Sequence, residues 1–325
     1  MTCYLGVDVG GTTIAAAVAA GDRGVAGDAP TTGTLGAELL GRAVTETPET
    51  GARAVTDAVL EAVERACAAA CREPPDVAAA AVGCVGPLDR EAGAIDGPAN
   101  VGGSEPIALV EPLRDRLETD DVALYNDATC GALAEYAAES VENLVYLTLS
   151  TGIGAGVIAD GAVLGGADGN AGEVGHTTVD PAGRMTCGCG GAGHWEAYAG
   201  GANVPRYAEW IHREESVETA LPVGTGALTA ADVFDAAGED ELANRVVERV
   251  GRWNAIGVAN VVQAFAPETV VIGGGVAVNN PDAVLEPIRR GVPDRVLLDA
   301  PEIRLTEFGG EVVLYGAVRA AMGEG

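Results

Sequence analysis

The chain has 325 residues, a length typical of two domains rather than of one hydrophobic core. Its 48 acidic and 19 basic residues give a formal net charge of −29, the wrong sign for a protein that binds nucleic acid. The sequence contains no lysine, so every basic residue other than histidine is arginine. Mechanisms that require a lysine, such as a Walker A loop, the protein-kinase strand or a Schiff base, are therefore excluded.

The excess of negative charge predicts that the protein works in a salt-rich environment. At molar salt the Debye length is only about 3 Å, so the repulsion between carboxylates is screened there. We therefore expect the protein of a halophile, which would lose stability and activity in dilute buffer.

The sequence shows no sign of export or membrane insertion. No apolar run approaches the roughly 18 residues that cross a bilayer. A strand-like run at 3–9 leaves no room for a signal peptide or an N-terminal DNA-binding domain. We therefore expect a cytoplasmic protein with neither a membrane nor a nucleic-acid partner. Five cysteines in apolar runs are expected to be buried free thiols: Cys3, Cys67, Cys71, Cys84 and Cys130.

Strands and helices alternate along the chain, and the pattern starts twice. The first half has predicted strands at 3–9, 12–20, 23–32, 77–85 and 122–125, helices at 51–72, 107–117 and 128–139, and a loop through Asn100. The second half has strands at 144–149, 156–159 and 269–272, a hairpin at 161–163, and helices at 229–237 and 239–265. Two halves that each begin strand, glycine turn, strand predict an α/β fold with duplicated domains around a central cleft.

The first glycine turn is a candidate phosphate site. Asp8 ends the first strand and is followed by Gly10, Gly11, Thr12 and Thr13. Paired glycines let a backbone approach a phosphate, the hydroxyls can donate to it, and Asp8 can hold Mg²⁺ through water. The alternative is an ordinary hairpin turn.

Two further glycine segments have the same character. Thr151 and Gly152 begin a glycine-rich turn that leads into a strand rather than a helix, which argues against a Rossmann loop and for a second phosphate-binding turn. Gly273, Gly274 and Gly275 end a buried strand, where the backbone can lie flat against an adenine or ribose. A glycine-rich hairpin and a simple strand-to-helix turn are the respective alternatives.

Asn126 and Asp127 lie between a strand and a helix. Ligands bind beyond the carboxyl ends of strands in such sheets, so Asp127 is placed to accept a proton from a substrate hydroxyl. Phosphoryl transfer needs mainly positioning, charge neutralisation and one such base. The alternative role for Asp127 is the N-cap of the helix.

A metal site is indicated by His176, Cys187, Cys189 and His194. Two thiolates and two imidazoles suit a closed, tetrahedral, structural Zn²⁺ site. Glu173 and Glu196 flank these ligands and are candidate acceptors for sugar hydroxyls, the alternative being solvated surface charges. His212 lies in a polar run and is interpreted as part of a surface helix.

Taken in order, the motifs resemble those of the ROK family of sugar kinases, and most closely its ATP-dependent glucokinases. The matching segments are DVGGTT, VGCVGPLD, PAN, YNDA, LSTGIGAGVI, AGEVGH, CGCGGAGHWE and APETVVIGGGV. The resemblance implies an actin-like ATPase fold, ribonuclease H-like in each half, whose two domains close over sugar and ATP. It divides the chain into 1–125, with a C-terminal helix at about 311–325 packed back on it, and 126–310.

The resemblance also implies roles for individual residues. Asp127 would be the base that activates the sugar 6-hydroxyl. The sugar would be held by Asn100, Asn126, Asp127, Glu173, His176 and Glu196. Magnesium and ATP would be held by Asp8, Gly10, Gly11, Thr12, Thr13, Thr151, Gly152, Gly273, Gly274 and Gly275. A homodimer is implied as well.

Several positions depart from the family pattern. His194 stands where cysteine is usual, Thr13 replaces a common lysine, and the loop after Asn100 lacks a frequent tryptophan. These departures bear on which sugar is used more than on the reaction. Glucose is the leading substrate, and kinases for fructose, mannose or an N-acetylhexosamine are the alternatives. A ROK-type sugar sensor without catalysis is the alternative from another class.

Overall fold

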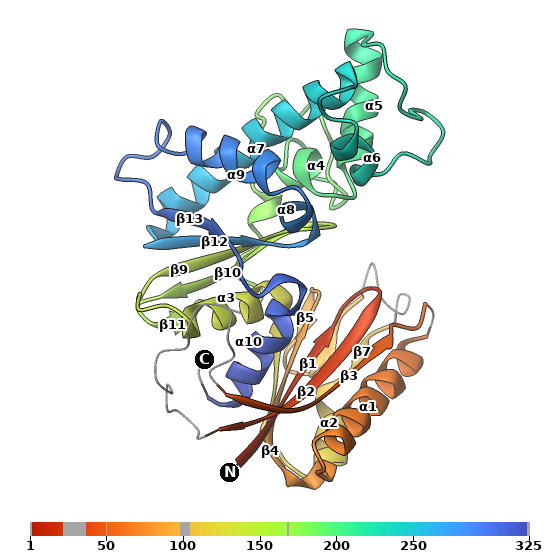
Figure 1. Cartoon of the computed structure of the whole chain (residues 1–325), viewed down its shortest axis with the longest axis vertical. Coiled ribbons are helices and arrows are strands. Elements are labelled where there is room, and N and C mark those ends of the chain that lie inside the picture. The colour runs from red at the N-terminus through yellow and green to blue at the C-terminus, as the bar shows by residue number, and fades with distance from the viewer. Residues whose placement is uncertain (1, 22–36, 50, 98–104, 168, 324–325) are drawn as a thin grey trace. The chain divides into compact units, whose positions relative to one another are not determined.

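The structure is a computed structural model that describes residues 2–21, 37–49, 51–97, 105–167 and 169–323 (Figure 1). The chain divides into two compact units. The first contains Met1–Tyr146, Gly156–Ala171 and Gly310–Gly325. The second contains Leu147–Ala155 and Gly172–Gly309. Asn100 lies outside the described residues.

The first unit is built on a five-stranded sheet in the order β3-β2-β1-β4-β8. Its strands are β1 (Thr2–Val9), β2 (Thr13–Gly21), β3 (Glu38–Glu46), β4 (Val77–Cys84) and β8 (Val122–Asn126). The first three pair antiparallel, whereas β4 runs parallel to both β1 and β8. All but one residue of β4 are buried, as expected for a central strand covered on both faces.

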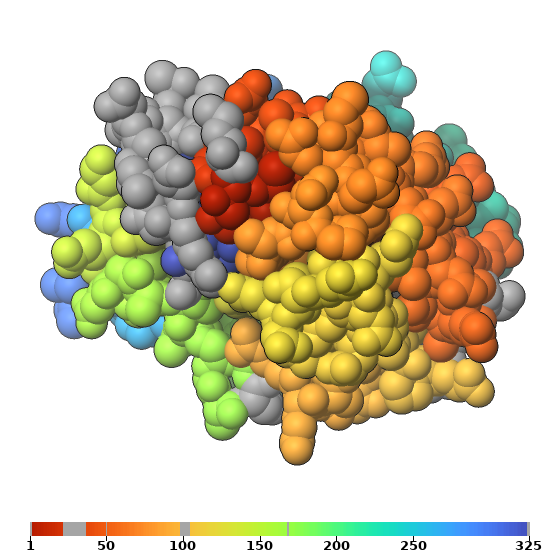
Figure 2. All heavy atoms as spheres, turned by 90° about the horizontal axis from the view of Figure 1, so that it is seen from below, coloured from red at the N-terminus to blue at the C-terminus, as the bar shows by residue number. Residues whose placement is uncertain are grey.

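Helices cover both faces of this sheet. On one face, α1 (Ala52–Ala69) and α2 (Val110–Leu117) bury apolar side chains against the strands. In Figure 2, the orange and yellow parts of the chain that contain these helices form much of the visible surface. On the other face, α10 (Val312–Ala321) packs on the sheet and on α3 (Asp127–Ala137). A side chain at Gly316 of α10 would lie 1.7 Å from the carbonyl oxygen of Cys130, so only glycine allows this approach.

The remaining elements of this unit are short. The 3₁₀ helix η1 (Pro74–Asp76) precedes β4. A small three-stranded sheet follows it, made of β5 (Leu88–Asp89), β6 (Ala94–Ile95) and β7 (Ile107–Ala108).

A second five-stranded sheet repeats the order of the first: β11-β10-β9-β12-β13. Its strands are β9 (Leu144–Leu149), β10 (Ile153–Ala159), β11 (Ala162–Val163), β12 (Thr269–Gly273) and β13 (Glu302–Leu305). In each sheet, the strand that comes first in the chain (β1 or β9) lies in the centre. It is flanked by the second strand (β2 or β10) and the fourth (β4 or β12). The duplication that the glycine turns predicted is therefore present in the strand order.

The second unit also contains one long helix and several shorter ones: η2 (Val174–His176), α4 (Glu196–Ala199), α5 (Val204–Glu215), α6 (Ala230–Asp235), α7 (Glu241–Phe265), α8 (Gly275–Asn279) and α9 (Pro281–Gly291). The 3₁₀ helix η3 (Gly309–Glu311) spans the point in the chain at which the second unit ends and the first resumes. Asp240 caps α7, since its carboxylate accepts a hydrogen bond of 3.0 Å from the Ala243 N–H. Within the described part of the chain, no helix is long and apolar enough to cross a membrane.

Two expectations about the chain differ from the structure, and a third cannot be compared with it. The strand predicted at 23–32 lies outside the described residues, and the third strand of the first sheet is β3. The predicted helix 107–117 starts only at Val110, because 107–108 pair with β6 as β7. Cys71 is exposed, whereas the other four cysteines expected to be buried are buried. It follows α1 with a φ of 53°, where the chain turns away from the helix.

The domain division at 125/126 stays a prediction. The compact units place α3 with the first sheet, because α3 packs against α10. The C-terminal helix belongs to this same unit and contacts β1 and β4.

Candidate functional site

Asp8 and Asp127 lie near each other in the first unit, at the carboxyl ends of parallel strands. Asp8 pairs in register with Gly83 of β4, and Gly83 pairs with Tyr125 of β8, two residues before Asp127. Burial raises the pKa of Asp8 to about 7, and the negative charge of Asp127 adds to this rise. A cation beside Asp8 would remove much of this cost of ionisation.

The first glycine turn is fixed by the segment that follows β3. The Gly10 N–H donates to the Thr13 carbonyl at 2.9 Å. Thr47 donates twice, from its hydroxyl to the Gly10 carbonyl at 2.7 Å and from its N–H to the Thr12 carbonyl at 3.0 Å. Thr12 and Thr13 remain exposed. Thr47 was missed in the sequence, since it lies 37 residues from Gly10 and belongs to no motif.

The N-cap of α3 is Asn126, so the cap role considered for Asp127 belongs to its neighbour. The Asn126 side chain accepts from the Ala128 N–H at 2.9 Å, and its backbone is extended, as an N-cap requires. Asp127 is the first helical residue and accepts from the same N–H at 2.7 Å. The helix start therefore fixes both side chains and favours the negative charge of Asp127.

Asn170 is a further residue that the sequence did not indicate. Its side chain exchanges two hydrogen bonds of 3.2 Å with the backbone of Leu88, 82 residues away. The loop thus fixed begins at Gly86, where an added side chain would lie 3.3 Å from the Asn126 amide nitrogen. Asn170 therefore positions a loop that packs beside Asn126.

The four predicted metal ligands meet in the second unit. One ligand atom from each of His176, Cys187, Cys189 and His194 lies within 4.8 Å of the others. The Cys187 sulfur is 3.6 Å from His176 Nδ1, and the Cys189 sulfur is 3.3 Å from His194 Nδ1. Tetrahedral Zn²⁺ holds sulfur and nitrogen ligands about 3.5 Å apart, so this donor set fits the ion.

The loop that carries the ligands is closed by backbone hydrogen bonds. The Cys187 N–H donates to the Gly191 carbonyl at 2.8 Å, and the Gly190 N–H donates to the Cys187 carbonyl at 2.9 Å. A side chain at Gly191 would lie 2.0 Å from the His194 ring, so glycine is needed there. Burial raises the pKa of Cys187 to about 11, which means that its thiolate forms readily only against a cation.

Glu173 and Glu196 both lie against the metal ligands but differ in burial. Glu173 is exposed, and its carboxylate is 3.6 Å from His176 Nε2, the nitrogen that faces away from Cys187. Partial loss of solvent raises the pKa of Glu173, and His176 opposes that rise. Glu196 is half-buried, and it accepts from the Ile153 N–H at 2.9 Å. Glu196 is therefore not simply a solvated surface charge.

The other two glycine segments lie together in the second unit. The carbonyls of Ser150 and Thr151 accept from the N–H groups of Gly201 and Ala202 at 2.7 and 3.0 Å. Gly274 has a φ of 88°, and an added side chain there would lie 2.5 Å from the Leu149 carbonyl oxygen. The strand-to-helix turn at Gly273–Gly275 and the turn at Thr151–Gly152 are thus packed against each other.

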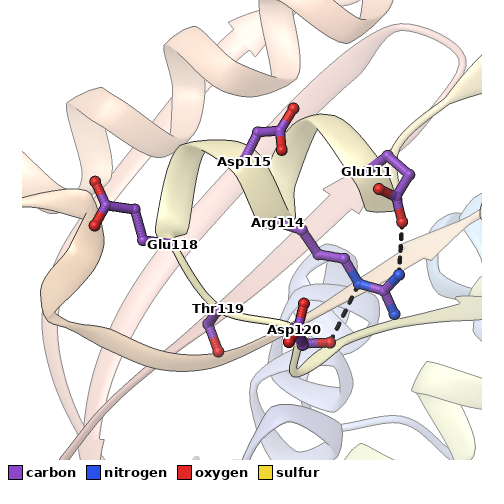
Figure 3. A pocket seen from close by; sticks show the side chains of 6 residues that line it. All are labelled: Glu111, Arg114, Asp115, Glu118, Thr119 and Asp120. Atoms are coloured by element: carbon purple, nitrogen blue, oxygen red, sulfur yellow. Dashed lines mark hydrogen bonds and ion pairs between the residues drawn. The ribbon is translucent and has the colours of Figure 1, made fainter.

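A hollow of about 380 Å³ on the first unit contains none of these residues (Figure 3). It is lined by Glu111, Arg114, Asp115, Glu118, Thr119 and Asp120. Arg114 donates to the Glu111 carboxylate at 2.6 Å and to the Asp120 carbonyl at 3.2 Å. The guanidinium is thereby bound within the hollow. His212, on α5, donates from Nδ1 to the Val217 carbonyl at 2.8 Å and is half-buried rather than fully exposed.

Known proteins resemble the chain over nearly its whole length. The sequence profile described as ROK family matches residues 4–317. The glucokinase of Pyrobaculum calidifontis is 36% identical over 250 residues, which cover 76% of this chain and 79% of that protein.

Two solved structures share the fold. The ROK hexokinase from Thermus thermophilus has a TM-score of 0.78 and 36% identity, with 99% of this chain and 98% of that chain covered. A ROK family glucokinase from Streptomyces griseus, solved with glucose and AMPPNP, has a TM-score of 0.74 and 28% identity, with 99% of each chain covered. The predicted α/β fold of the actin-like ATPase type is thereby confirmed, and the chain belongs to the ROK family.

Proposed function

We propose that the chain is an ATP-dependent hexose kinase that phosphorylates the 6-hydroxyl of glucose. The observation that carries the proposal is the pair Asp8 and Asp127, placed at the ends of parallel strands beside a glycine turn. The similarity to the Pyrobaculum calidifontis glucokinase and to the Streptomyces griseus enzyme solved with glucose and AMPPNP supports it. The choice of glucose as the substrate rests on those relatives.

Asp127 acts as the general base. Its carboxylate accepts the proton of the 6-hydroxyl as that oxygen attacks the γ-phosphorus and the bond to ADP breaks. The start of α3 orients the carboxylate, and a helix N-terminus favours its negative charge. Asn126 is proposed to hold the sugar next to Asp127.

Asp8 and the glycine segments serve ATP and Mg²⁺. Bound Mg²⁺ supplies positive charge that neutralises the phosphate oxygens during transfer. Asp8 would hold that ion through water. Phosphate and nucleoside contacts are assigned to the backbone N–H groups and hydroxyls of Gly10–Thr13, Thr151, Gly152 and Gly273–Gly275.

The remaining sugar contacts are assigned to Glu173, His176 and Glu196, with Asn100 outside the described residues. Bound Zn²⁺ would fix the segment 176–194 that carries His176. With its Nδ1 toward the metal ligands, His176 keeps Nε2 for a sugar hydroxyl or Glu173. Kinases for fructose, mannose or an N-acetylhexosamine remain the alternatives. The homodimer also stays a prediction.

A coupled kinase assay over a hexose panel, with ATP, Mg²⁺ and molar KCl, tests the proposal. Glucose should give the highest kcat/KM. Asp127→Asn should lower turnover by about 10²- to 10⁴-fold while glucose binding, measured by calorimetry, is retained. Asp120→Asn makes the same change on the surface of the first unit and is the matched control. Undiminished phosphorylation by Asp127→Asn would remove Asp127 from the mechanism.

A further inference from the structure

The Glu196 carboxylate connects two segments that are 43 residues apart. Glu196 is the first residue of α4 and follows the metal ligand His194 by two residues. Its Oε2 accepts a hydrogen bond of 2.9 Å from the N–H of Ile153. Ile153 is the first residue of β10 and comes directly after Thr151-Gly152. The carboxylate therefore lies against the turn to which phosphate binding is assigned.

The fit between Glu196 and this turn is close. A side chain at Gly152 would lie 2.5 Å from Glu196 Oε2, so the carboxylate reaches the Ile153 N–H only because residue 152 is glycine. A side chain at Gly200 would likewise lie 2.8 Å from Glu196 Cγ. Glycine backbone thus lines Oε2 and the Cγ methylene of Glu196, whereas Oε1 lies 3.6 Å from the Cys187 sulfur.

The turn is held from two directions by the segment that begins with α4. The carbonyls of Ser150 and Thr151 accept from the N–H groups of Gly201 and Ala202. The Ile153 N–H, one residue beyond the turn, donates to the Glu196 carboxylate at 2.9 Å. A hydrogen bond from a backbone N–H to a carboxylate is stronger than one between neutral groups, so this contact fixes the turn.

We propose that Glu196 is a positioning residue for ATP, which acts on the nucleotide through the Ile153 amide, in addition to its contact with the sugar. This rests on the proposed phosphate-binding role of the Thr151-Gly152 turn. Placement of reacting groups is sensitive to shifts of about 1 Å, so a released turn binds ATP less well and places it less accurately. The same carboxylate then serves both substrates of the reaction.

Substitution of Glu196 tests the proposal. Glu196→Ala removes the acceptor, whereas Glu196→Gln keeps an oxygen that can accept from Ile153. For the alanine variant we expect faster hydrogen exchange of the Ile153 amide, followed by NMR without substrates. We also expect AMPPNP binding and KM for ATP weaker by about 10-fold or more. The glutamine variant should recover most of both properties. Weaker sugar binding alone, with the Ile153 amide still protected and ATP binding unchanged, would overturn the proposal.

A second set of variants changes Gly152 in the turn, on the other side of this contact. Gly152→Ala places a methyl group against the Glu196 carboxylate and should also expose the Ile153 amide. In the Glu196→Ala background the methyl group has room, so Gly152→Ala should add little, and the two effects on ATP binding should be far from additive. Fully additive effects would contradict the assignment. The exchange measurement needs no catalysis, so a wild-type chain that fails to phosphorylate sugars would refute the kinase proposal while leaving this contact testable.

Discussion

The charge of Asp127 raises the pKa of Asp8, although the two residues are more than 100 positions apart in the sequence. The parallel pairing of β1, β4 and β8 causes this, since it brings the carboxyl ends of the three strands to one edge of the sheet. Two carboxylates at such an edge cannot both ionise without cost. Their arrangement therefore favours a bound cation, which is what transfer from Mg-ATP requires.

Asp127→Asn should lower the pKa of Asp8, because it removes the negative charge that disfavours ionisation. The pKa should stay above the ordinary value of 3.8, since burial is the larger cause and is unchanged. A carbon NMR titration of the carboxyl groups in the ligand-free chain measures both values. An Asp8 pKa that is the same in the variant and in the wild type would contradict the coupling.

The stability of the ligand-free chain should fall as pH rises from about 4 to 7. Asp8 keeps its proton up to about pH 7 in the folded chain and loses it near 3.8 when unfolded, so the folded state binds the extra proton in this window. Asp8→Asn should therefore be more stable than the wild type above pH 7, on the order of 2 kcal/mol after allowance for partial exposure.

Urea unfolding at pH 4 and pH 8, without Mg²⁺ or nucleotide, measures the difference between Asp8→Asn and the wild type. The advantage of the variant should be nearly absent at pH 4. Asp115→Asn, an exposed change on α2, is the control. An equal gain in stability at both pH values would show that packing of the new side chain, rather than loss of the Asp8 charge, is responsible.

Metal removal should destabilise the second unit. We expect one Zn²⁺ per chain by elemental analysis, and a melting temperature that falls by several degrees when a chelator removes it. Cys187→Ala should lose the ion and show the same lower melting temperature without chelator. Cys71→Ala removes an exposed thiol outside the cluster and should retain the ion. Full metal content in Cys187→Ala would exclude Cys187 as a ligand.

The sequence predicted those parts of the site that are local in the chain. Asp8 and Asp127 were identifiable because each lies at the carboxyl end of a strand, and parallel strands end at one edge. The ligands from Cys187 to His194 lie within eight positions, so their spacing alone suggested a metal. The duplicated order of the sheets also followed from local signals, since each half starts with strand, glycine turn and strand.

Contacts over long sequence distances were not predictable in this way. Asn170 binds Leu88 across 82 positions, and Glu196 binds Ile153 across 43, so neither pairing leaves a local pattern. The strand β3 was missed for another reason: most of its side chains are exposed or half-buried, so its hydrophobic alternation is weak. The N-cap was assigned to Asp127 as an alternative because Asn and Asp are equally good caps, and only backbone geometry distinguishes them.

Gly316→Ala should strongly destabilise the first unit, because the new methyl group would lie 1.7 Å from the Cys130 carbonyl and push α10 away from α3. We expect a loss of about 3 kcal/mol or more in the free energy of unfolding. Gly310→Ala is the matched control, since nothing lies within 4 Å of the added carbon. Similar unfolding midpoints in urea for the two variants would contradict the close packing of α10 on α3.

Stability should also rise with salt concentration. The net charge of −29 repels itself, and the Debye length falls from about 10 Å at 0.1 M to about 3 Å at 1 M salt. Surface ion pairs such as that of Arg116 with Glu64 weaken under the same screening, but each contributes little. The melting temperature should therefore increase between 0.1 and 2 M KCl, and kinase activity should follow it. Sucrose at matched osmolality separates screening from general exclusion of solute, because it carries no charge. A melting temperature that is independent of KCl, or raised equally by sucrose, would show that self-repulsion does not limit the stability of this chain.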